Sequence, residues 1–238
     1  MKNLCDMHTH TVLSGHGYSS LSENILYASD LGLKYLGVSD HQPDEADVGA
    51  KKDAFNALEH CPESWKGVRI YRGCEFNILE GGIIDPMGIE TSRLDFGIAS
   101  LHSYAYLGSR DKMIITDCYL KVLDLDYITI LGHIDDGSFK PDYEEVIRKA
   151  KENHKLIELN NSSLYRDTSR KNTKENLKTI IGLCIQYDQP IIIDSDAHIC
   201  FEIGNFELME EFISKTELPK KLIVNQSEEL IREYFEKN

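Results

Sequence analysis

The segment Leu4-Cys5-Asp6-Met7-His8-Thr9-His10 carries most of the information about how this chain folds. It reads as a short apolar β-strand that ends in two histidines separated by one residue. Because side chains alternate along a strand, His8 and His10 point to the same face and can bind one ion together. Taken alone, the segment fits an exposed histidine pair without a ligand equally well.

A second pair repeats this spacing near the other end of the chain. The fragment Asp194-Ser195-Asp196-Ala197-His198 follows the last predicted strand, and Asp196 and His198 are again two residues apart. Coincidence explains one such pair more easily than two pairs at equivalent places. The two pairs together therefore favour a shared metal site over unrelated surface residues.

Short apolar runs rich in β-branched residues alternate with amphipathic helical stretches along the whole chain. This alternation predicts an α/β fold, in which helices cover a parallel sheet. We expect one domain over residues 1–238, because α/β barrels of this length commonly form a single domain. The predicted strands are residues 4–8, 35–39, 69–75, 96–101, 128–132, 156–160 and 191–195. The predicted helices are residues 22–31, 51–60, 111–123, 143–153, 174–187, 206–215 and 228–236.

The candidate ligands lie at or just beyond the C-terminal ends of different predicted strands. In βα barrels the catalytic groups gather at this rim, because the loops of every unit converge there. We therefore expect the following distant residues to meet: His8, His41, Glu75, His102, His133 and His198. Taken singly, a histidine such as His16 or His133 is more often a hydrogen-bonded structural residue than a ligand.

Glu75 is a candidate for a different reason. It lies in the apolar segment Ile70-Tyr71-Arg72-Gly73-Cys74-Glu75-Phe76, where an unpaired carboxylate is costly unless a cation or hydrogen-bond donors compensate it. A carboxylate also has two oxygens and can bridge two ions. Glu75 is therefore the expected centre of a polynuclear site.

Composition and charge exclude several classes of partner. The formal net charge of −14 argues against a broad face that binds nucleic acid or membranes, because both are polyanionic. There is no apolar run of the length of a signal peptide or a membrane span. The six cysteines are scattered without a CxxC pair, which is typical of reduced thiols. We expect a cytoplasmic protein with no membrane partner; nucleic acid is disfavoured, and the oligomeric state is left open.

Several fragments together carry a family resemblance, and they follow one another in a fixed order. They are Asp6-Met7-His8-Thr9-His10, His16, Ser39-Asp40-His41, Gly73-Cys74-Glu75, Ser100-Leu101-His102, Gly132-His133, Glu158 to Ser163, and Asp194 to His198. This set resembles the PHP (polymerase and histidinol phosphatase) domain, and within it the small stand-alone bacterial phosphatases with a trinuclear metal centre. The resemblance spans essentially the whole chain and implies a distorted, seven-stranded (β/α)7 TIM-like barrel.

The resemblance also implies how the ligands divide among three divalent ions. The first ion is held by His8, His10, Glu75 and Asp196. Glu75 bridges to a second ion, held also by His102 and His133. The third ion is held by His16, His41 and His198. Zinc is the expected metal, with manganese and iron as alternatives, because imidazole and carboxylate sites admit all three.

This ligand set predicts hydrolysis of a phosphate ester. Two ions that share Glu75 would be spaced to bridge a hydroxide, and the remaining ion would bind phosphoryl oxygens. The residues expected to carry catalysis are Glu75, His10 and Asp196. Arg170 and Lys171 follow the sixth predicted strand and are expected to clamp the phosphate, although a solvated basic loop explains them as well. Tyr104 either lines the pocket or packs against the sheet.

The leading hypothesis is therefore a phosphomonoesterase that acts on a small phosphorylated metabolite. A phosphodiesterase or exonuclease would share the metal chemistry, but it needs a groove for a polymer, and the acidic charge balance counts against it. A third hypothesis is a non-catalytic accessory domain that metals stabilise. The full ligand set on a free-standing chain counts against this third hypothesis.

Overall fold

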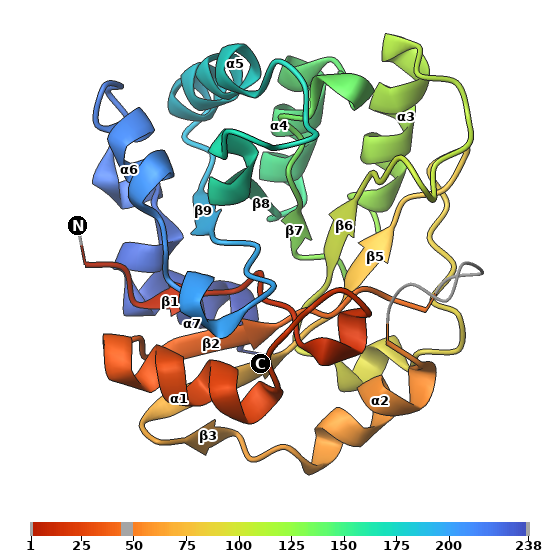
Figure 1. Cartoon of the computed structure of the whole chain (residues 1–238). Helices are drawn as coiled ribbons and strands as arrows, with labels where there is room; N and C mark the ends of the chain where they lie inside the picture. Colours follow the sequence, from red (N-terminus) through yellow and green to blue (C-terminus); the bar gives the residue numbers. More distant parts are fainter. Residues whose placement is uncertain (1, 44–49, 237–238) are drawn as a thin grey trace.

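The strands of the molecule form two sheets that lie at an angle to each other (Figure 1). The structure, a computed structural model, describes residues 2–43 and 50–236. In the first sheet the order is β1 (Cys5–Asp6), β2 (Tyr35–Val38), β4 (Val68–Arg72) and β3 (Ser64–Trp65), with β3 antiparallel to β4. The second sheet is all parallel, in the order β5 (Glu75–Asn77), β6 (Ile98–Ser100), β7 (Ile130–Leu131), β8 (Leu156–Asn160) and β9 (Ile191–Asp194).

Helices cover the outer faces of both sheets, which confirms the predicted α/β alternation. Helices α3 (Lys112–Val122), α4 (Tyr143–Glu152) and α5 (Thr173–Gln186) lie beside the second sheet, and α1 (Leu21–Leu31) and α2 (Lys52–Ala57) lie beside the first (Figure 1). Helices α6 (Glu207–Ile213) and α7 (Glu228–Phe235) complete the chain. The start of α1 is fixed by a capping box between Ser20 and Glu23.

The predicted strand over residues 69–75 is in fact two strands. β4 pairs with β2, whereas β5 pairs with β6, so the chain changes sheets at Gly73 and Cys74. Glycine is required at this crossing, because a Cβ on Gly73 would lie only 2.3 Å from Cζ of Phe96. One isolated parallel bridge, between His41 and Glu75, links the two sheets beyond the crossing.

The two sheets meet again between β1 and β9, where side chains join the strands and one isolated parallel bridge pairs Thr9 with Ala197 just beyond them. Asp194 Oδ1 accepts a hydrogen bond from the Met7 amide at 2.7 Å. Asp6 Oδ2 accepts one from the Ser195 hydroxyl at 2.6 Å. Burial raises the pKa of Asp6 to about 6, and the hydrogen bonds that Asp6 accepts from Ser195 and from the Gly204 amide oppose that rise.

Asn225, which follows the last strand in the sequence, also links β1 to β9; we call this junction of the two sheets the seam. Its Nδ2 donates to the carbonyl oxygens of Cys5 and Ile193, at 3.1 and 2.7 Å. The α/β class is confirmed, whereas the prediction of one closed, seven-stranded barrel is not confirmed by the hydrogen-bonded ladders. Within the described residues there are nine strands in two sheets, and both junctions between the sheets are interrupted.

A buried apolar cluster occupies the opposite end of these strands from the polar groups described below. It combines side chains of both sheets, such as Met7, Tyr71 and Ile192, with Ile231 and Phe235 of α7. The cluster fixes the strands relative to one another, so the residues at their C-terminal ends are held on a rigid base. None of the helices in the described ranges is long and apolar enough to cross a membrane.

Candidate metal centre

The side chains that the sequence predicts as ligands converge at the C-terminal ends of the strands. His8 and His10 follow β1, His41 follows β2, and Glu75 begins β5. His16 lies in the loop between β1 and α1, His102 follows β6 and His133 follows β7. Asp196 and His198 follow β9. The parallel strands place these loops at one edge, which is why residues so distant in sequence meet.

Glu75 lies at the centre of the group, with a side chain only 1% exposed. Its Oε1 lies 3.3 Å from Nε2 of His102 and 3.1 Å from Nε2 of His133. Its Oε2 faces other rings, 3.3 Å from Nε2 of His8 and 2.8 Å from Nδ1 of His41. The two oxygens of one carboxylate thus face separate sets of imidazoles, which is the arrangement that a bridging ligand needs.

Asp196 also divides its two oxygens. Oδ1 lies 3.5 Å from Nε2 of His8 and 3.2 Å from Nε2 of His10, whereas Oδ2 accepts a hydrogen bond from Arg170 Nη2 at 2.7 Å. The backbone of Asp196 is left-handed, with φ of 58°, as is that of His133, with φ of 31°. Such conformations are uncommon outside glycine and often mark functional positions.

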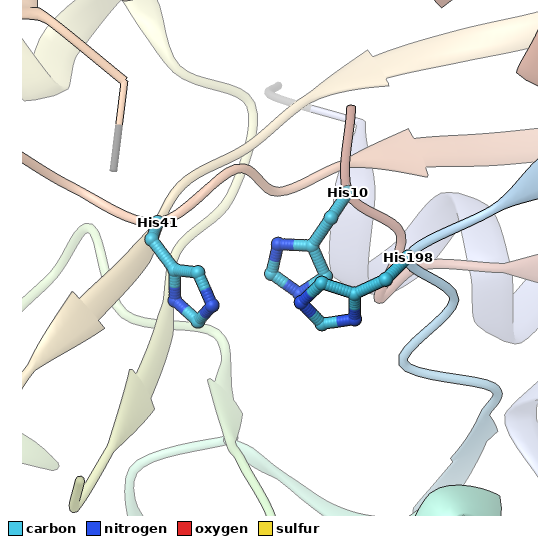
Figure 2. A group of neighbouring side chains, drawn as sticks. All are labelled: His10, His41 and His198. Carbon is cyan, nitrogen blue, oxygen red and sulfur yellow. The ribbon is translucent and has the colours of Figure 1, made fainter. Parts of the chain in front are cut away.

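A third group of imidazoles lies beside the first. Figure 2 shows the rings of His10, His41 and His198 turned toward one another, and one nitrogen of each lies within 4.8 Å of the others. The centroid of the His16 ring is 5.1 Å from that of His41 and 4.4 Å from that of His198. His16 belongs to this group, and His10 lies between it and the Glu75 carboxylate.

Several buried ligand atoms in this centre have no hydrogen bond of acceptable geometry within the described part of the chain. They are Nε2 of His8, His10 and His198, Nδ1 of His41, and Oε2 of Glu75. An unsatisfied buried polar group costs about 1–3 kcal/mol, so five in one place would be strongly destabilising. Nitrogen and carboxylate donors of this kind fit divalent transition metals, which would satisfy all of them.

In two of the candidate ligand rings, Nδ1, the nitrogen that points away from Glu75, lies at hydrogen-bond distance from a buried side chain. His8 Nδ1 lies 2.6 Å from Oε1 of Glu158, and His102 Nδ1 lies 2.7 Å from Oδ1 of Asn77. Both oxygens can only accept, so the proton must sit on Nδ1 of each ring. In the neutral ring Nε2 is then the unprotonated nitrogen, and it is the atom that faces Glu75.

His10 is oriented through a hydroxyl. Ser14 Oγ donates to Asp40 Oδ1 at 2.6 Å, and the same oxygen lies 3.0 Å from Nδ1 of His10. Because the Ser14 proton is given to Asp40, Ser14 accepts the proton of His10 Nδ1. Asp40 is fixed in turn by the amide of Thr11 at 2.7 Å.

The charge states of Glu75, His10 and His102 suit cation binding. Burial alone would raise the pKa of Glu75, but His8, His102 and His41 hold it well below its usual range. Burial lowers the pKa of His10, and it lowers the pKa of His102 to about 4. The carboxylate is thus ionised and both of these imidazoles are neutral near pH 7, which are the forms that bind metal.

Glu158 has a central place in the structure, although no role for it was predicted from the sequence. Its Oε1 faces His8, while its Oε2 accepts hydrogen bonds from the His133 amide at 2.6 Å and from Asn160 Nδ2 at 3.1 Å. The sequence does contain an indication of this role, because Glu158 interrupts the apolar strand Leu156–Asn160 just as Glu75 interrupts its own apolar segment. Both are buried carboxylates that require compensation.

The two predicted basic residues have different surroundings. Arg170 lines a cavity of about 160 Å³ together with ligand side chains and Tyr104, and its Nη1 donates to Asn160 Oδ1 and Ser162 Oγ at 3.0 and 2.8 Å. Lys171 is exposed and does not line this cavity. Its backbone amide instead donates to a carboxylate oxygen of Asp136.

Comparison with known proteins assigns the chain to a family. The sequence profile of the PHP domain matches residues 6–164. The chain is 39% identical over 237 residues to a protein of Clostridium botulinum named "Probable phosphatase", covering 99% of this chain and 95% of the relative. A "Probable phosphatase" of Acetivibrio thermocellus is 35% identical over 243 residues, covering 100% of this chain and 97% of the relative.

Two solved structures share the fold at low identity. One is the crystal structure of histidinol phosphate phosphatase from Lactococcus lactis complexed with zinc, L-histidinol and phosphate, with a TM-score of 0.63, 16% identity, and coverage of 91% of this chain and 95% of that one. The other is a chain in the cryo-EM structure of archaeal ribonuclease P with mature tRNA, with a TM-score of 0.57, 18% identity, and coverage of 97% and 87%. The chain belongs to the PHP domain family, as its motifs predicted.

Proposed function

We propose that this protein is a metal-dependent phosphoesterase, and more specifically a phosphomonoesterase that hydrolyses a small phosphorylated metabolite. The observation that carries the proposal is Glu75, whose two oxygens face separate sets of imidazoles. The relatives named probable phosphatases support the activity, and the zinc and phosphate bound by the Lactococcus lactis protein support the chemistry.

The site is proposed to hold three divalent transition metals, with zinc first and manganese or iron as alternatives. The first ion is assigned to His8, His10, Glu75 and Asp196. The second is assigned to Glu75, His102 and His133. The third is assigned to His16, His41 and His198. The unsatisfied buried atoms support this division, and the proximity of His10 to His41 and His198 ties the first group to the third.

Bound divalent ions supply a lowered pKa of coordinated water and positive charge opposite the phosphoryl oxygens. The side chains of the protein orient the ligands. Glu158 and Asn77 fix the proton on the far nitrogen of their rings, so that Nε2 stays available. Arg170 holds Asp196 through Oδ2 and has further N–H groups at the cavity, where a phosphate would accept them. We assign the phosphate contact to Arg170 and not to Lys171.

A small substrate is favoured over a polymer. The cavity at the metal centre has a volume of about 160 Å³, which suits a phosphoryl group. The formal net charge of −14 opposes the approach of a polyanion. We also propose a single domain over residues 1–238 and a cytoplasmic location. The six cysteines, all free, support that location.

The test is metal analysis and turnover on the same preparation. The purified protein should contain about three equivalents of transition metal per chain and hydrolyse p-nitrophenyl phosphate. Exhaustive chelation should remove both properties, and added zinc, manganese or iron should restore them. Full activity in the metal-free protein would refute the proposed function.

A further inference from the structure

Asp135 is a buried carboxylate close to the metal centre to which the proposed function gives no role. It lies in the loop after β7, two residues beyond His133, and its exposed fraction is 0%. Its Oδ1 accepts a hydrogen bond from the Ser163 hydroxyl at 3.2 Å, whereas Oδ2 has no hydrogen-bond partner among the described residues. A buried carboxylate with so few donors is costly unless a cation lies near it.

Arg170 is the cation that compensates Asp135. Its Nη1 donates to Ser163 Oγ at 2.9 Å, so a single hydroxyl links the guanidinium to the carboxylate. Burial would lower the pKa of Arg170, whereas Asp196 and Asp135 raise it above its ordinary value. The charge of Asp135 therefore stabilises that of Arg170 across Ser163.

The two hydrogen bonds of Ser163 have a fixed direction. An ionised carboxylate can only accept, so Ser163 gives its single hydroxyl proton to Asp135. The hydroxyl oxygen then accepts from Arg170, whose guanidinium can only donate. Asp135 thus keeps Ser163 in the orientation that receives the guanidinium.

Asp135 is itself held in place through its backbone. Asn176 Nδ2, on the first turn of α5, donates to the Asp135 carbonyl oxygen at 2.8 Å. The Gly137 amide donates to the Lys171 carbonyl oxygen at 2.7 Å. These bonds join the loop after β7 to the segment that carries Arg170, so Asp135 and Arg170 have a fixed spatial relation.

The other partners of Arg170 all belong to the surroundings of Asp196. Nη2 donates to Asp196 Oδ2 at 2.7 Å, and Nη1 donates to Asn160 and Ser162. The side chains of Asn160 and Ser162 in turn donate to the same Asp196 oxygen, at 3.2 and 3.1 Å. Ser163, bound to Asp135, is thus the one anchor of the guanidinium in the described chain that does not depend on a metal-ligand candidate.

The guanidinium keeps donors for a ligand while it is held in this way. Among the described residues, none accepts a hydrogen bond from Nε, and Nη2 has one acceptor for its two N–H groups. Nε and the second N–H of Nη2 remain for a phosphate in the cavity that Arg170 lines. The direction of these donors depends on how firmly Nη1 is held.

We infer that Asp135 is a positioning residue for phosphate binding, which holds the Arg170 guanidinium at the cavity through the Ser163 hydroxyl. The inference rests on the proposed function, since it takes phosphate as the ligand of that cavity. Because Asp135 is not a ligand candidate, its loss should weaken phosphate binding and leave the metal ions in place.

Two variants break this link at different points. Asp135→Asn removes the charge and keeps the side-chain shape, and Ser163→Ala removes the hydroxyl between the two groups. In the metal-loaded protein each should raise KM for p-nitrophenyl phosphate and the inhibition constant of inorganic phosphate by about three- to fivefold. Neither kcat nor the metal content should change. Unchanged inhibition constants, or a loss confined to kcat and metal content through His133, would overturn the inference.

A double-mutant cycle shows whether the effect passes through Arg170. In the Arg170→Ala background, Asp135→Asn should change the inhibition constant of phosphate by less than about twofold, because no guanidinium is left to position. The same change in both backgrounds would contradict the inference. Two controls each remove an exposed carboxylate and should keep the wild-type values: Asp167→Asn, in the same loop as Arg170, and Glu229→Gln, on α7. If Asp135→Asn does not fold, as judged by circular dichroism, the same cycle with Ser163→Ala decides.

Failure of the proposed function gives a different result. If the metal-loaded protein does not hydrolyse p-nitrophenyl phosphate, the phosphoesterase proposal fails. Calorimetric dissociation constants for inorganic phosphate then decide the role of Asp135. Weaker binding in Asp135→Asn and Ser163→Ala at unchanged metal content supports it, whereas equal binding, or no binding even to the wild type, rejects it.

Discussion

Glu158 Oε1 lies 2.6 Å from Nδ1 of His8, and the opposite nitrogen of that ring lies 3.3 Å from Glu75. One imidazole is therefore held between two buried carboxylates, one that fixes its proton and one at the proposed metal site. Glu158 also accepts the backbone amide of His133, so it braces ligands of both ions that Glu75 is proposed to bridge. This makes Glu158 a positioning residue of the centre.

The first prediction concerns that brace. Glu158→Gln should weaken zinc binding about 10- to 100-fold, because a neutral amide orients the His8 ring less firmly and lowers its basicity. Zinc dissociation constants from competition with a chelator provide the measurement, and circular dichroism checks the fold. The control is Glu229→Gln, which should bind zinc as the wild type does. Wild-type affinity in Glu158→Gln would show that the contact is only structural.

The second prediction concerns Glu75 itself. Glu75→Gln keeps the volume of the side chain but removes the charge that both sets of imidazoles face. Turnover of p-nitrophenyl phosphate should fall by about 100-fold or more, and the metal content should drop. The assay is kcat at saturating metal together with elemental analysis, with Glu229→Gln again as the matched control. A variant with normal kcat and three equivalents of metal would remove the bridging role.

The third prediction separates Arg170 from Lys171. Arg170→Ala should raise KM and weaken inhibition by inorganic phosphate by about tenfold, because the positive charge that lines the cavity and the hydrogen bond to Asp196 are lost. Lys171→Ala should change either value by less than about twofold, since this side chain lies outside the cavity lining. Arg170→Lys should recover only part of the effect. The hypothesis is rejected if the two alanine variants have the same inhibition constant for phosphate.

The fourth prediction concerns the crossing between the sheets. Gly73→Ala should destabilise the fold by about 1–3 kcal/mol, because the new Cβ would meet the ring of Phe96 at 2.3 Å. Gly182 in α5 offers the opposite case, since a Cβ there meets nothing within 4 Å. Gly182→Ala should stabilise by about 0.5–1 kcal/mol through helix propensity. Urea unfolding of both variants measures the difference, and equal stability of the two would contradict this explanation.

The convergence of the candidate ligands at one edge of the sheet could be predicted from the sequence, for a physical reason. His8 and His10 share a strand face, and the C-terminal ends of parallel strands meet at one edge of a sheet, so spacing alone places them together. The same rule placed His41, Glu75 and the later histidines at that edge, whereas the division among three ions came only from the family resemblance. The structure brings these side chains around one centre.

The division of the strands into two sheets could not be predicted from the sequence in the same way. The apolar run over residues 69–75 is continuous in sequence, and the conflict between Gly73 and Phe96 exists only once the tertiary structure forms. The seam between β1 and β9 depends on Asn225, which contacts Cys5 across 220 positions. Glu158 was missed because its partner, His8, lies 150 positions away.

The central claim is that Glu75 joins two metal ions, and anomalous diffraction from crystals of the zinc-loaded protein tests it most directly. The account predicts one anomalous peak beside each carboxylate oxygen of Glu75, the first bounded by His8 and His10 and the second by His102 and His133. A single peak at this carboxylate, or peaks that leave both of its oxygens without a metal, would contradict the account.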